Sequence, residues 1–112
     1  MAVDQQARLD LRPFAVTRGD ALRVEPEPLV LPRTRIDATL LLPVGADEGA
    51  YEVRLLDHDL AARATAKGNA SIVDFVTTLR ATLDLRELQP GVYQLGVRRV
   101  GGEWQMFPAR LP

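Results

Sequence analysis

The feature that most constrains this chain is an alternation of apolar and polar side chains with a period of two residues. It is longest between Val73 and Leu85. The odd-numbered positions there are mostly apolar: Val73, Phe75, Thr77, Leu79, Ala81, Leu83 and Leu85. Successive side chains of a β-strand point to opposite faces. The pattern therefore predicts one long strand over these residues, with Phe75 and the leucines in the core and the even-numbered positions in water.

Shorter stretches with the same period predict further strands, and no stretch predicts an amphipathic helix. The clearest one alternates from Ile36 to Leu42 and ends at Pro43. Tyr51 to Leu56 is expected to be its return strand in a hairpin, across the Gly45–Gly49 turn. The remaining candidates are a hairpin of residues 92–100 and 103–111 around Gly101-Gly102, and short strands at 62–66 and within 22–31.

This spacing of strands and turns is typical of a sandwich of two sheets, because one sheet could not cover both its leucines and the large aromatic side chains. We therefore expect an all-β fold, an antiparallel immunoglobulin-like β-sandwich of about seven strands. The 112 residues suit a single domain, which we place at residues 7–112. The polar stretch from Met1 to Gln6 is expected to be disordered.

A local motif supports the sandwich. Pro90-Gly91 forms a turn two residues before Tyr93, which opens the strand of residues 92–100. This resembles the tyrosine corner of immunoglobulin-like domains, in which the phenol hydroxyl reaches back to the backbone near the preceding turn. We therefore assign Tyr93 a structural role.

Composition excludes several classes of function. The 14 basic and 15 acidic residues nearly cancel, so no nucleic-acid partner is expected. The chain has no cysteine, which removes disulfides and thiolate metal sites, and no cofactor or metal is expected. No apolar stretch approaches the ~18 residues that a membrane helix needs, and the first residues lack the apolar core of a secretory signal.

The catalytic options are few, so we expect no enzyme. A hydrolase would have to use Ser71 and His58, since each is the only residue of its type. Asp57 and Asp59 flank His58 and could suggest a metal site. On a strand, however, the two aspartates would point away from the histidine, so a polar strand end that leads into a turn is the simpler interpretation.

Two further functions remain. Leu41, Leu56 and Val76 are apolar residues at positions expected to face water, which makes them candidates for binding a protein partner or a second copy, through a sheet face or an edge strand. Burial under a neighbouring loop would explain them equally well. The alternative is a carbohydrate- or peptidoglycan-binding module that uses Trp104 and the loop from Asp57 to Asp59.

The order of motifs along the chain resembles that of a known family. These motifs are Leu9-Asp10-Leu11-Arg12-Pro13, Thr17-Arg18-Gly19, Leu29-Val30-Leu31-Pro32, Leu40-Leu41-Leu42-Pro43, Tyr51-Glu52-Val53-Arg54-Leu55-Leu56-Asp57, Leu79-Arg80-Ala81-Thr82-Leu83-Asp84-Leu85 and Leu88-Gln89-Pro90-Gly91-Val92-Tyr93-Gln94-Leu95. The chain looks like the extracytoplasmic immunoglobulin-like C-terminal domain of bacterial membrane proteins that begin with a zinc-finger anti-sigma-like module.

The resemblance covers residues 9–111. It implies a periplasmic sensing or protein-interaction domain of a membrane regulatory protein, cut from a longer chain. A complete gene product would instead be expected in the cytoplasm.

Overall fold

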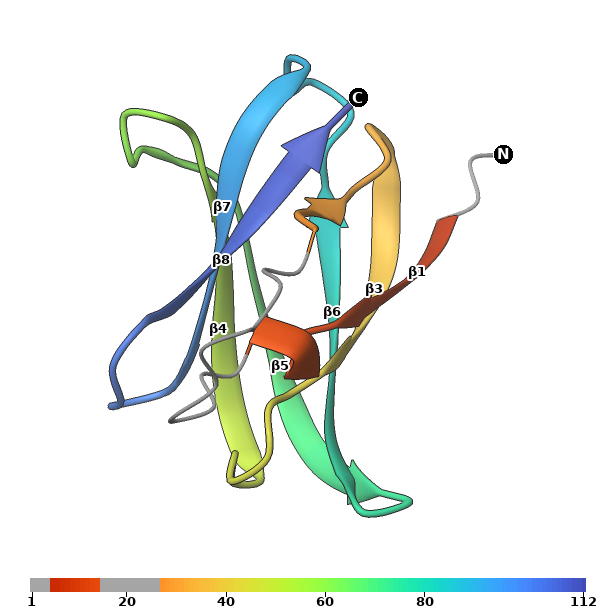
Figure 1. Cartoon of the computed structure of the whole chain (residues 1–112), viewed down its shortest axis with the longest axis vertical. Helices are drawn as coiled ribbons and strands as arrows, with labels where there is room; N and C mark the ends of the chain where they lie inside the picture. Colours follow the sequence, from red (N-terminus) through yellow and green to blue (C-terminus); the bar gives the residue numbers. More distant parts are fainter. Residues whose placement is uncertain (1–4, 15–26) are drawn as a thin grey trace, which may run out of the picture.

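The computed structural model describes residues 5–14 and 27–112 of the chain. Within these residues the fold is all-β, as the alternation predicts (Figure 1). The elements are β1 (Gln5–Asp10), a 3-10 turn η1 (Arg12–Phe14), β2 (Leu29–Val30), β3 (Arg35–Leu41), β4 (Gly49–Leu56), β5 (Ala62–Val73), β6 (Val76–Asp84), β7 (Gly91–Arg99) and β8 (Gln105–Leu111).

The eight described strands form one mixed sheet in the order β1-β3-β6-β5-β4-β7-β8-β2. Eight strands agree with the expectation of about seven, but two other expectations are wrong: the strands form one sheet rather than two, and the pairs β1–β3 and β2–β8 are parallel rather than antiparallel. Both parallel strands come from the N-terminal part of the chain and form the two ends of the sheet. A short turn cannot join two parallel strands, and a long stretch of chain separates the two strands of each of these parallel pairs.

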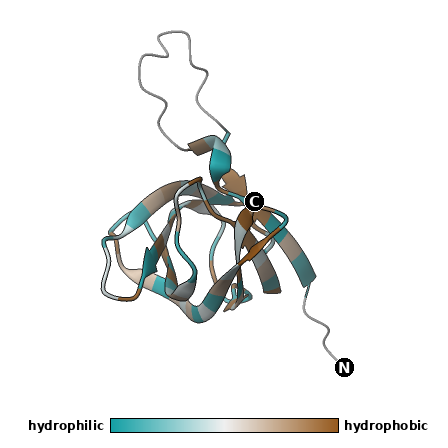
Figure 2. Ribbon diagram, turned by 90° about the horizontal axis from the view of Figure 1, so that it is seen from below, coloured by the Kyte–Doolittle hydropathy of each residue, from teal (hydrophilic) through white to brown (hydrophobic). Residues whose placement is uncertain are grey.

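Strand β5 makes the sheet continuous. Its first part, Ala62–Ala70, pairs with β4, and its last part, Ala70–Val73, pairs with β6. The strand thereby joins β1-β3-β6 to β4-β7-β8-β2, and the sheet curves into a nearly closed barrel. Viewed along the long axis, the strands surround the interior (Figure 2).

The close passage of β5 beside β6 depends on Gly68. A Cβ atom added there would lie 2.1 Å from the carbonyl oxygen of Arg80, a distance that no side chain tolerates. Glycine inside a strand often marks such a close approach of two backbones. The absence of a side chain at Gly68 is therefore a condition for the crossing of β5.

The core is mainly aliphatic. Alternate residues of β6 are buried as predicted, including Leu79 and Leu83, both fully inaccessible to solvent. They belong to the same buried cluster as inward-facing residues of β1, β3, β4, β5, β7 and β8. Phe107 of β8 adds an edge-to-face contact with Phe14 of η1, with ring centroids 5.8 Å apart. Each buried leucine contributes roughly 1.5–3 kcal/mol relative to an exposed one.

The expected single strand from Val73 to Leu85 is wrong at its beginning. Val73 ends β5, and Val76 begins β6, so a two-residue turn of Asp74 and Phe75 divides the stretch. Phe75 is fully exposed rather than in the core. The prediction fails because neither Asp74 nor Phe75 is a glycine, so the sequence lacks the usual signal for a two-residue turn.

The expected hairpin between Ile36–Leu42 and Tyr51–Leu56 is also wrong. Strand β3 pairs with β1 and β6, whereas β4 pairs with β5 and β7. Both edges of β3 are therefore occupied, and the connection through Gly45 carries the chain across the barrel. Alternation identifies a strand, but it does not identify the neighbours of that strand.

The N-terminal expectations are met only in part. Gln5 and Gln6, assigned to a disordered start, belong to β1 and align with Ile36 and Asp37. Met1 to Asp4 lie outside the described residues. Of the short strand expected within residues 22–31, the structure describes β2 at its end, and residues 22–26 are again outside the described part.

The tetrapeptide Leu-Asp-Leu-Arg occurs twice, at residues 9–12 and 83–86, and has the same role each time. The aspartate ends a strand, the second leucine is fully buried, and the arginine side chain donates hydrogen bonds to the aspartate two residues earlier. Asp84 accepts hydrogen bonds from Arg86 Nε at 2.9 Å and Nη2 at 2.7 Å, and Asp10 accepts the same pair from Arg12 at 2.8 Å each. Both hydrogen-bonded arginines lower the aspartate pKa, and that of Asp84 falls to about 2.

Replacing Gly68 with alanine tests the crossing of β5. We expect Gly68→Ala to lower the free energy of unfolding by about 3 kcal/mol, at the upper end of the usual overpacking cost, because the backbone at Arg80 must move. Chemical denaturation measures the loss. Ser71→Ala, at an exposed position of the same strand, should change it by less than about 0.5 kcal/mol. Equal effects of the two substitutions would contradict the close approach.

The low pKa of Asp84 predicts a pH dependence. A carboxylate whose pKa is lower in the folded state stabilises that state above its ordinary pKa of 3.8, and the contribution disappears as the pH falls toward 2. The denaturation midpoint of Asp84→Asn should therefore lie below that of the wild type at neutral pH and approach it between pH 4 and pH 2. In an Arg86→Gln background, Asp84→Asn should shift the denaturation midpoint by much less. A difference that is constant with pH would refute the assignment.

Candidate functional site

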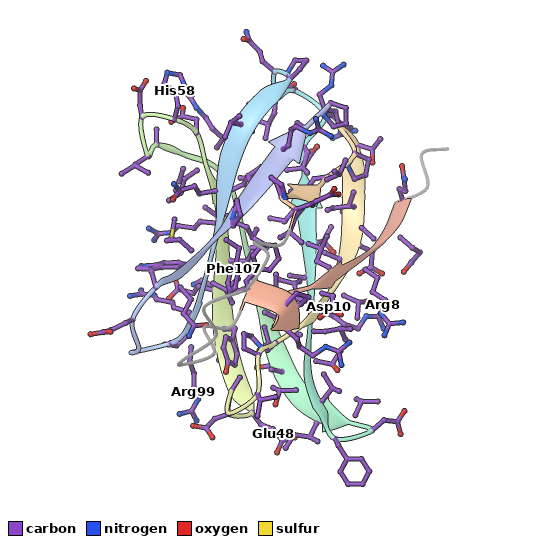
Figure 3. All side chains as sticks on the ribbon, in the orientation of Figure 1. Arg8, Asp10, Glu48, His58, Arg99 and Phe107 are labelled. Atoms are coloured by element: carbon purple, nitrogen blue, oxygen red, sulfur yellow. The ribbon has the colours of Figure 1, made fainter. Side chains whose placement is uncertain are left out.

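Two of the three apolar candidates, Leu41 and Val76, lie in one shallow groove on the outer surface of β1, β3 and β6. This outer groove has a volume of about 430 Å³. It is lined by Gln6, Ala7, Arg8, Arg12, Thr39, Leu41, Val73, Asp74, Val76 and Thr78. Arg8 and Asp10 project from β1 at its side (Figure 3). The groove thus combines an apolar floor with charged side chains at its rim.

Leu41 is not the exposed contact that the sequence suggested, because only 6% of it is accessible. Strand β1 runs beside β3 and places Asp10 opposite Leu41. Arg12, paired with Asp10 at 2.8 Å, lines the groove over the same region. Leu41 therefore forms part of the floor, whereas Val76 is half-buried and accessible from the groove.

Leu56, the third candidate, lies elsewhere. It ends β4, where it aligns with Gln94 of β7 and Ala62 of β5, and it is half-buried. No residue of β4 or β7 lines the outer groove. The structure thus separates Leu56 from the other two.

Several exposed apolar side chains, including the two most exposed of the described residues, lie near the end of the outer groove. We call Val44, Ile72, Val73 and Phe75 the apolar tip. Phe75 is 102% exposed and Val44 is 98% exposed, relative to the extended chain. The loop that carries Val44 is attached to the β5–β6 hairpin, since Glu48 accepts a hydrogen bond from the Ile72 amide at 2.8 Å. Glu48 is at the lower end of Figure 3, beside this hairpin.

The backbone of the tip has an unusual conformation. Asp74 has a φ of 50° and Phe75 a φ of 68°, and the pair Val73–Val76 closes the two-residue turn between them. Two positive φ values at the centre of a tight hairpin are typical of type I′ turns, which favour Asp-Gly or Asn-Gly. A bulky aromatic residue with positive φ is a genuine outlier. Phe75 thus occupies a glycine position and places its ring in water.

The sequence contains a signal for this tip that we did not use. Ile72, Val73, Phe75 and Val76 are apolar at both odd and even positions, and only Asp74 interrupts them. A strand with one wet face does not have apolar residues of both parities, so the run marks a place where the alternation ends.

Tyr93 makes the contact typical of a tyrosine corner. Its hydroxyl donates a hydrogen bond to the Gln89 carbonyl, four residues earlier, at 2.8 Å. Gly91, between them, has a φ of 152°. The ring is buried at the start of β7. The bond attaches the turn before β7 to the core.

Tyr51 makes the same contact at the other end of the barrel, and the sequence analysis did not identify it. Its hydroxyl donates to the Asp47 carbonyl at 2.6 Å, again four residues earlier, across Gly49 with a φ of 134°. Burial raises the pKa of this hydroxyl. The shared spacing, glycine two residues before tyrosine, was available in the sequence.

The loop that follows β4 is organised by Asp57. This buried carboxylate accepts hydrogen bonds from the amides of Asp59 at 2.9 Å and Ala61 at 3.0 Å, and from Arg63 Nε at 2.6 Å. The bond from Arg63 lowers the pKa of Asp57 most. Asp57 is thus held inside its own turn, and its oxygens are already occupied.

His58 and Ser71 are far apart. His58 is exposed in the turn before β5, with its Nε2 atom 3.3 Å from Asp59 Oδ2. Ser71 lies near the other end of β5. The intervening strand is about 30 Å long at the usual rise per residue. The two residues do not form a hydrogen-bonded pair. Within residues 5–14 and 27–112, no group of three or more acidic or histidine side chains could hold a metal ion.

Trp104 lies on the outside of the barrel. Its ring covers Gly96 of β7, where an added Cβ would be 3.3 Å from the indole. The guanidinium groups of Arg54 and Arg98 each lie 4.7 Å from the ring centroid. Asp57 and His58 instead line a depression with residues 87–93 to which Trp104 does not contribute. The structure thus separates Trp104 from the loop with which we associated it.

In the described part of the chain no helix is long and apolar enough to span a membrane. Comparisons with models of protein families, with curated proteins and with solved structures found no match to this chain.

The two tyrosine bonds predict equal and independent effects. Tyr51→Phe and Tyr93→Phe should each lower the free energy of unfolding by about 1 kcal/mol, because each removes the hydrogen bond between a buried tyrosine and the preceding turn. The two residues are separated by most of the length of β7, about 20 Å at the usual strand rise, so the double variant should lose about the sum. Chemical denaturation of the three variants checks this. If Tyr51→Phe left the free energy of unfolding unchanged, the Tyr51 hydrogen bond would contribute nothing to stability.

Proposed function

We propose that this chain is a non-catalytic protein-interaction module that associates with a second copy of itself. In the complex, the apolar tip of each copy lies in the outer groove of the other. The observation that carries the proposal is Phe75, a fully exposed aromatic side chain held at a backbone position that favours glycine.

Folding alone does not explain this residue. A non-glycine residue in the left-handed region costs of the order of 1–3 kcal/mol, and strain of this kind clusters at functional sites. Exposure of the ring adds no compensating burial. Ile72 is 56% exposed and Val73 51% exposed beside it. An exposed cluster of this kind is typical of an interaction site.

The outer groove has the properties of a receptor for such a tip. Leu41 and Val76 give it an apolar floor, and its volume of about 430 Å³ has room for an aromatic ring. Arg8 at its rim is in none of the ion pairs found among the described residues, and neither is Asp74, the acidic neighbour of Phe75. A two-fold axis near the tip would bring Asp74 of each copy toward Arg8 of the other. Such an interface is self-complementary, as closed dimers require.

We also propose that the two halves of the single sheet, β1-β3-β6 and β4-β7-β8-β2, correspond to the two layers of an immunoglobulin-like sandwich, and that the chain is an extracytoplasmic, periplasmic sensing domain of a bacterial membrane regulatory protein. The support is the bond from Tyr93 to Gln89 and the sequence motifs that resemble that family. Sequencing the gene on both sides tests this: a zinc-finger motif followed by a membrane helix upstream is expected. A gene that encodes neither would contradict it.

The alternative, a carbohydrate- or peptidoglycan-binding module, has less support. A sugar needs a free aromatic face for stacking, and Arg54 and Arg98 both lie against the Trp104 ring. The acidic loop from Asp57 to Asp59 is elsewhere and engaged in its own turn. A hydrolase is no better supported, because most of the length of β5 separates Ser71 from His58.

Sedimentation velocity over a series of protein concentrations tests self-association through the tip. The wild type should shift from monomer to dimer as concentration rises, and Phe75→Asn should remain monomeric to at least tenfold higher concentration, a difference of about 1.4 kcal/mol. Asparagine tolerates a positive φ better than phenylalanine, so this variant should be at least as stable as the wild type.

The matched control is Val92→Asn, which removes an exposed apolar side chain at the opposite end of the barrel and should leave the dimer unchanged. Arg8→Glu should weaken the dimer, and Arg8→Glu combined with Asp74→Arg should restore it in part. A wild type that stays monomeric throughout, or a Phe75→Asn variant that associates normally, would overturn the proposal.

A further inference from the structure

A second surface, on the other side of the barrel, carries a cluster of cationic side chains around the single tryptophan. We call Glu52, Arg54, Thr65, Lys67, Arg98 and Trp104 the arginine–tryptophan cluster. It lies on the outward faces of β4, β5 and β7 and shares no residue with the apolar tip or the outer groove.

The register of the strands brings these residues together. Strand β4 alternates inward Val53 and Leu55 with outward Glu52 and Arg54. In the pairing with β5, Glu52 aligns with Lys67 and Arg54 aligns with Thr65. In the pairing with β7, Glu52 aligns with Arg98 and Arg54 aligns with Gly96.

Gly96 makes room for the tryptophan. It has no side chain, and an added Cβ would lie 3.2 Å from the Met106 sulfur and 3.3 Å from the Trp104 ring. The indole therefore lies directly over the β7 backbone. Arg54 and Arg98 both contact it, each with its guanidinium carbon 4.7 Å from the ring centroid. Guanidinium groups favour such positions because the ring face is negative.

The two arginines differ in what else they bind. Arg98 donates to Glu52 Oε1 at 3.0 Å, so its charge is partly balanced. Arg54 and Lys67 take part in no ion pair or side-chain hydrogen bond found within the described residues. Three cations thus surround one carboxylate, which leaves an excess of two positive charges at this place.

Arg54 is held in a fixed direction. A guanidinium group that stacks on an aromatic ring keeps the N–H groups along its edge free, and their planar arrangement matches the oxygens of a carboxylate or a phosphate. The adjoining groove has a volume of about 430 Å³ and is lined by Arg54, Lys67, Thr65 and Glu52, among others. Thr65 adds a hydroxyl donor at its edge. Such a set suits an oxyanion.

We propose that the arginine–tryptophan cluster binds the carboxylate or phosphate group of an acidic ligand. Arg54 donates to two oxygens of that group, Lys67 supplies a second positive charge, and Thr65 donates through its hydroxyl. The Trp104 ring, which Arg98 also contacts, holds Arg54 in place. The proposal does not depend on self-association, because the two surfaces are separate.

The fluorescence of Trp104 reports on this site directly, since the chain contains no other tryptophan. Titration with inorganic phosphate and, separately, with a short oligo-aspartate peptide should give a saturable change in emission. Sodium chloride at the same ionic strength should give only a weak, unsaturated change from screening. Saturation by one anion and not the other identifies which oxyanion the site takes and supports the proposal.

Arg54→Gln and Lys67→Gln should each weaken the binding about tenfold or more, because each removes a charge-assisted contact. Calorimetric titration gives a second readout that does not depend on the tryptophan environment, which Arg54→Gln itself changes. Arg33→Gln is the matched control, since it removes one exposed positive charge away from the cluster and should bind normally.

Two results would overturn the proposal. One is the absence of saturable binding of both anions in the wild type. The other is an equal loss of affinity in Arg33→Gln and Arg54→Gln, which would show that net charge alone attracts the anion. Circular dichroism of every variant shows that the fold is retained, and Arg54→Lys should recover only part of the affinity, because lysine cannot donate to two oxygens from one planar group.

Discussion

The passage of β5 from one half of the barrel to the other is the constraint on which the rest of the structure depends. The strand pairs with β4 before Ala70 and with β6 after it. That change of partner requires the backbones of β5 and β6 to meet at Gly68, where only a hydrogen atom fits beside the Arg80 carbonyl. The sheet can then enclose the leucine core, and β5 must leave the barrel as a hairpin whose tip carries Phe75.

The same constraint accounts for the two surfaces described above. Where β5 lies beside β4, it places Thr65 and Lys67 next to Arg54 and the tryptophan. Where it lies beside β6, it ends in the apolar tip, next to the groove of β3 and β6. One strand therefore contributes a cationic surface at its beginning and an apolar one at its end. The buried tyrosines, Tyr51 and Tyr93, attach the turns at opposite ends of the barrel.

What the sequence predicted well was local. The alternation around Leu79 and Leu83 identified a strand and its buried face, and the Pro-Gly turn before Tyr93 identified a contact to the preceding backbone. The second tyrosine contact follows the same spacing and was open to prediction. Each of these features depends on residues only a few positions apart, so the pattern contains the necessary information.

What the sequence did not predict depends on distant residues. The pairing of β3 with β6 rather than β4 is decided by which edges are free in the finished barrel. Phe75 is exposed because it lies in a turn, which the sequence does not mark with a glycine. Leu41 is buried because β1 runs beside it, and the sequence analysis predicted no strand there. The cluster at Trp104 needs the register of three strands, and the grouping of Trp104 with Asp57 failed for the same reason.

The pairing of β5 with two different strands can be measured directly by nuclear Overhauser contacts between backbone protons. The account predicts contacts from Gly68 to Tyr51 of β4 and from Ile72 to Thr77 of β6 in the same molecule. Backbone contacts of Asp74 and Phe75 with a neighbouring strand, as in an uninterrupted strand through residues 73–85, would contradict it.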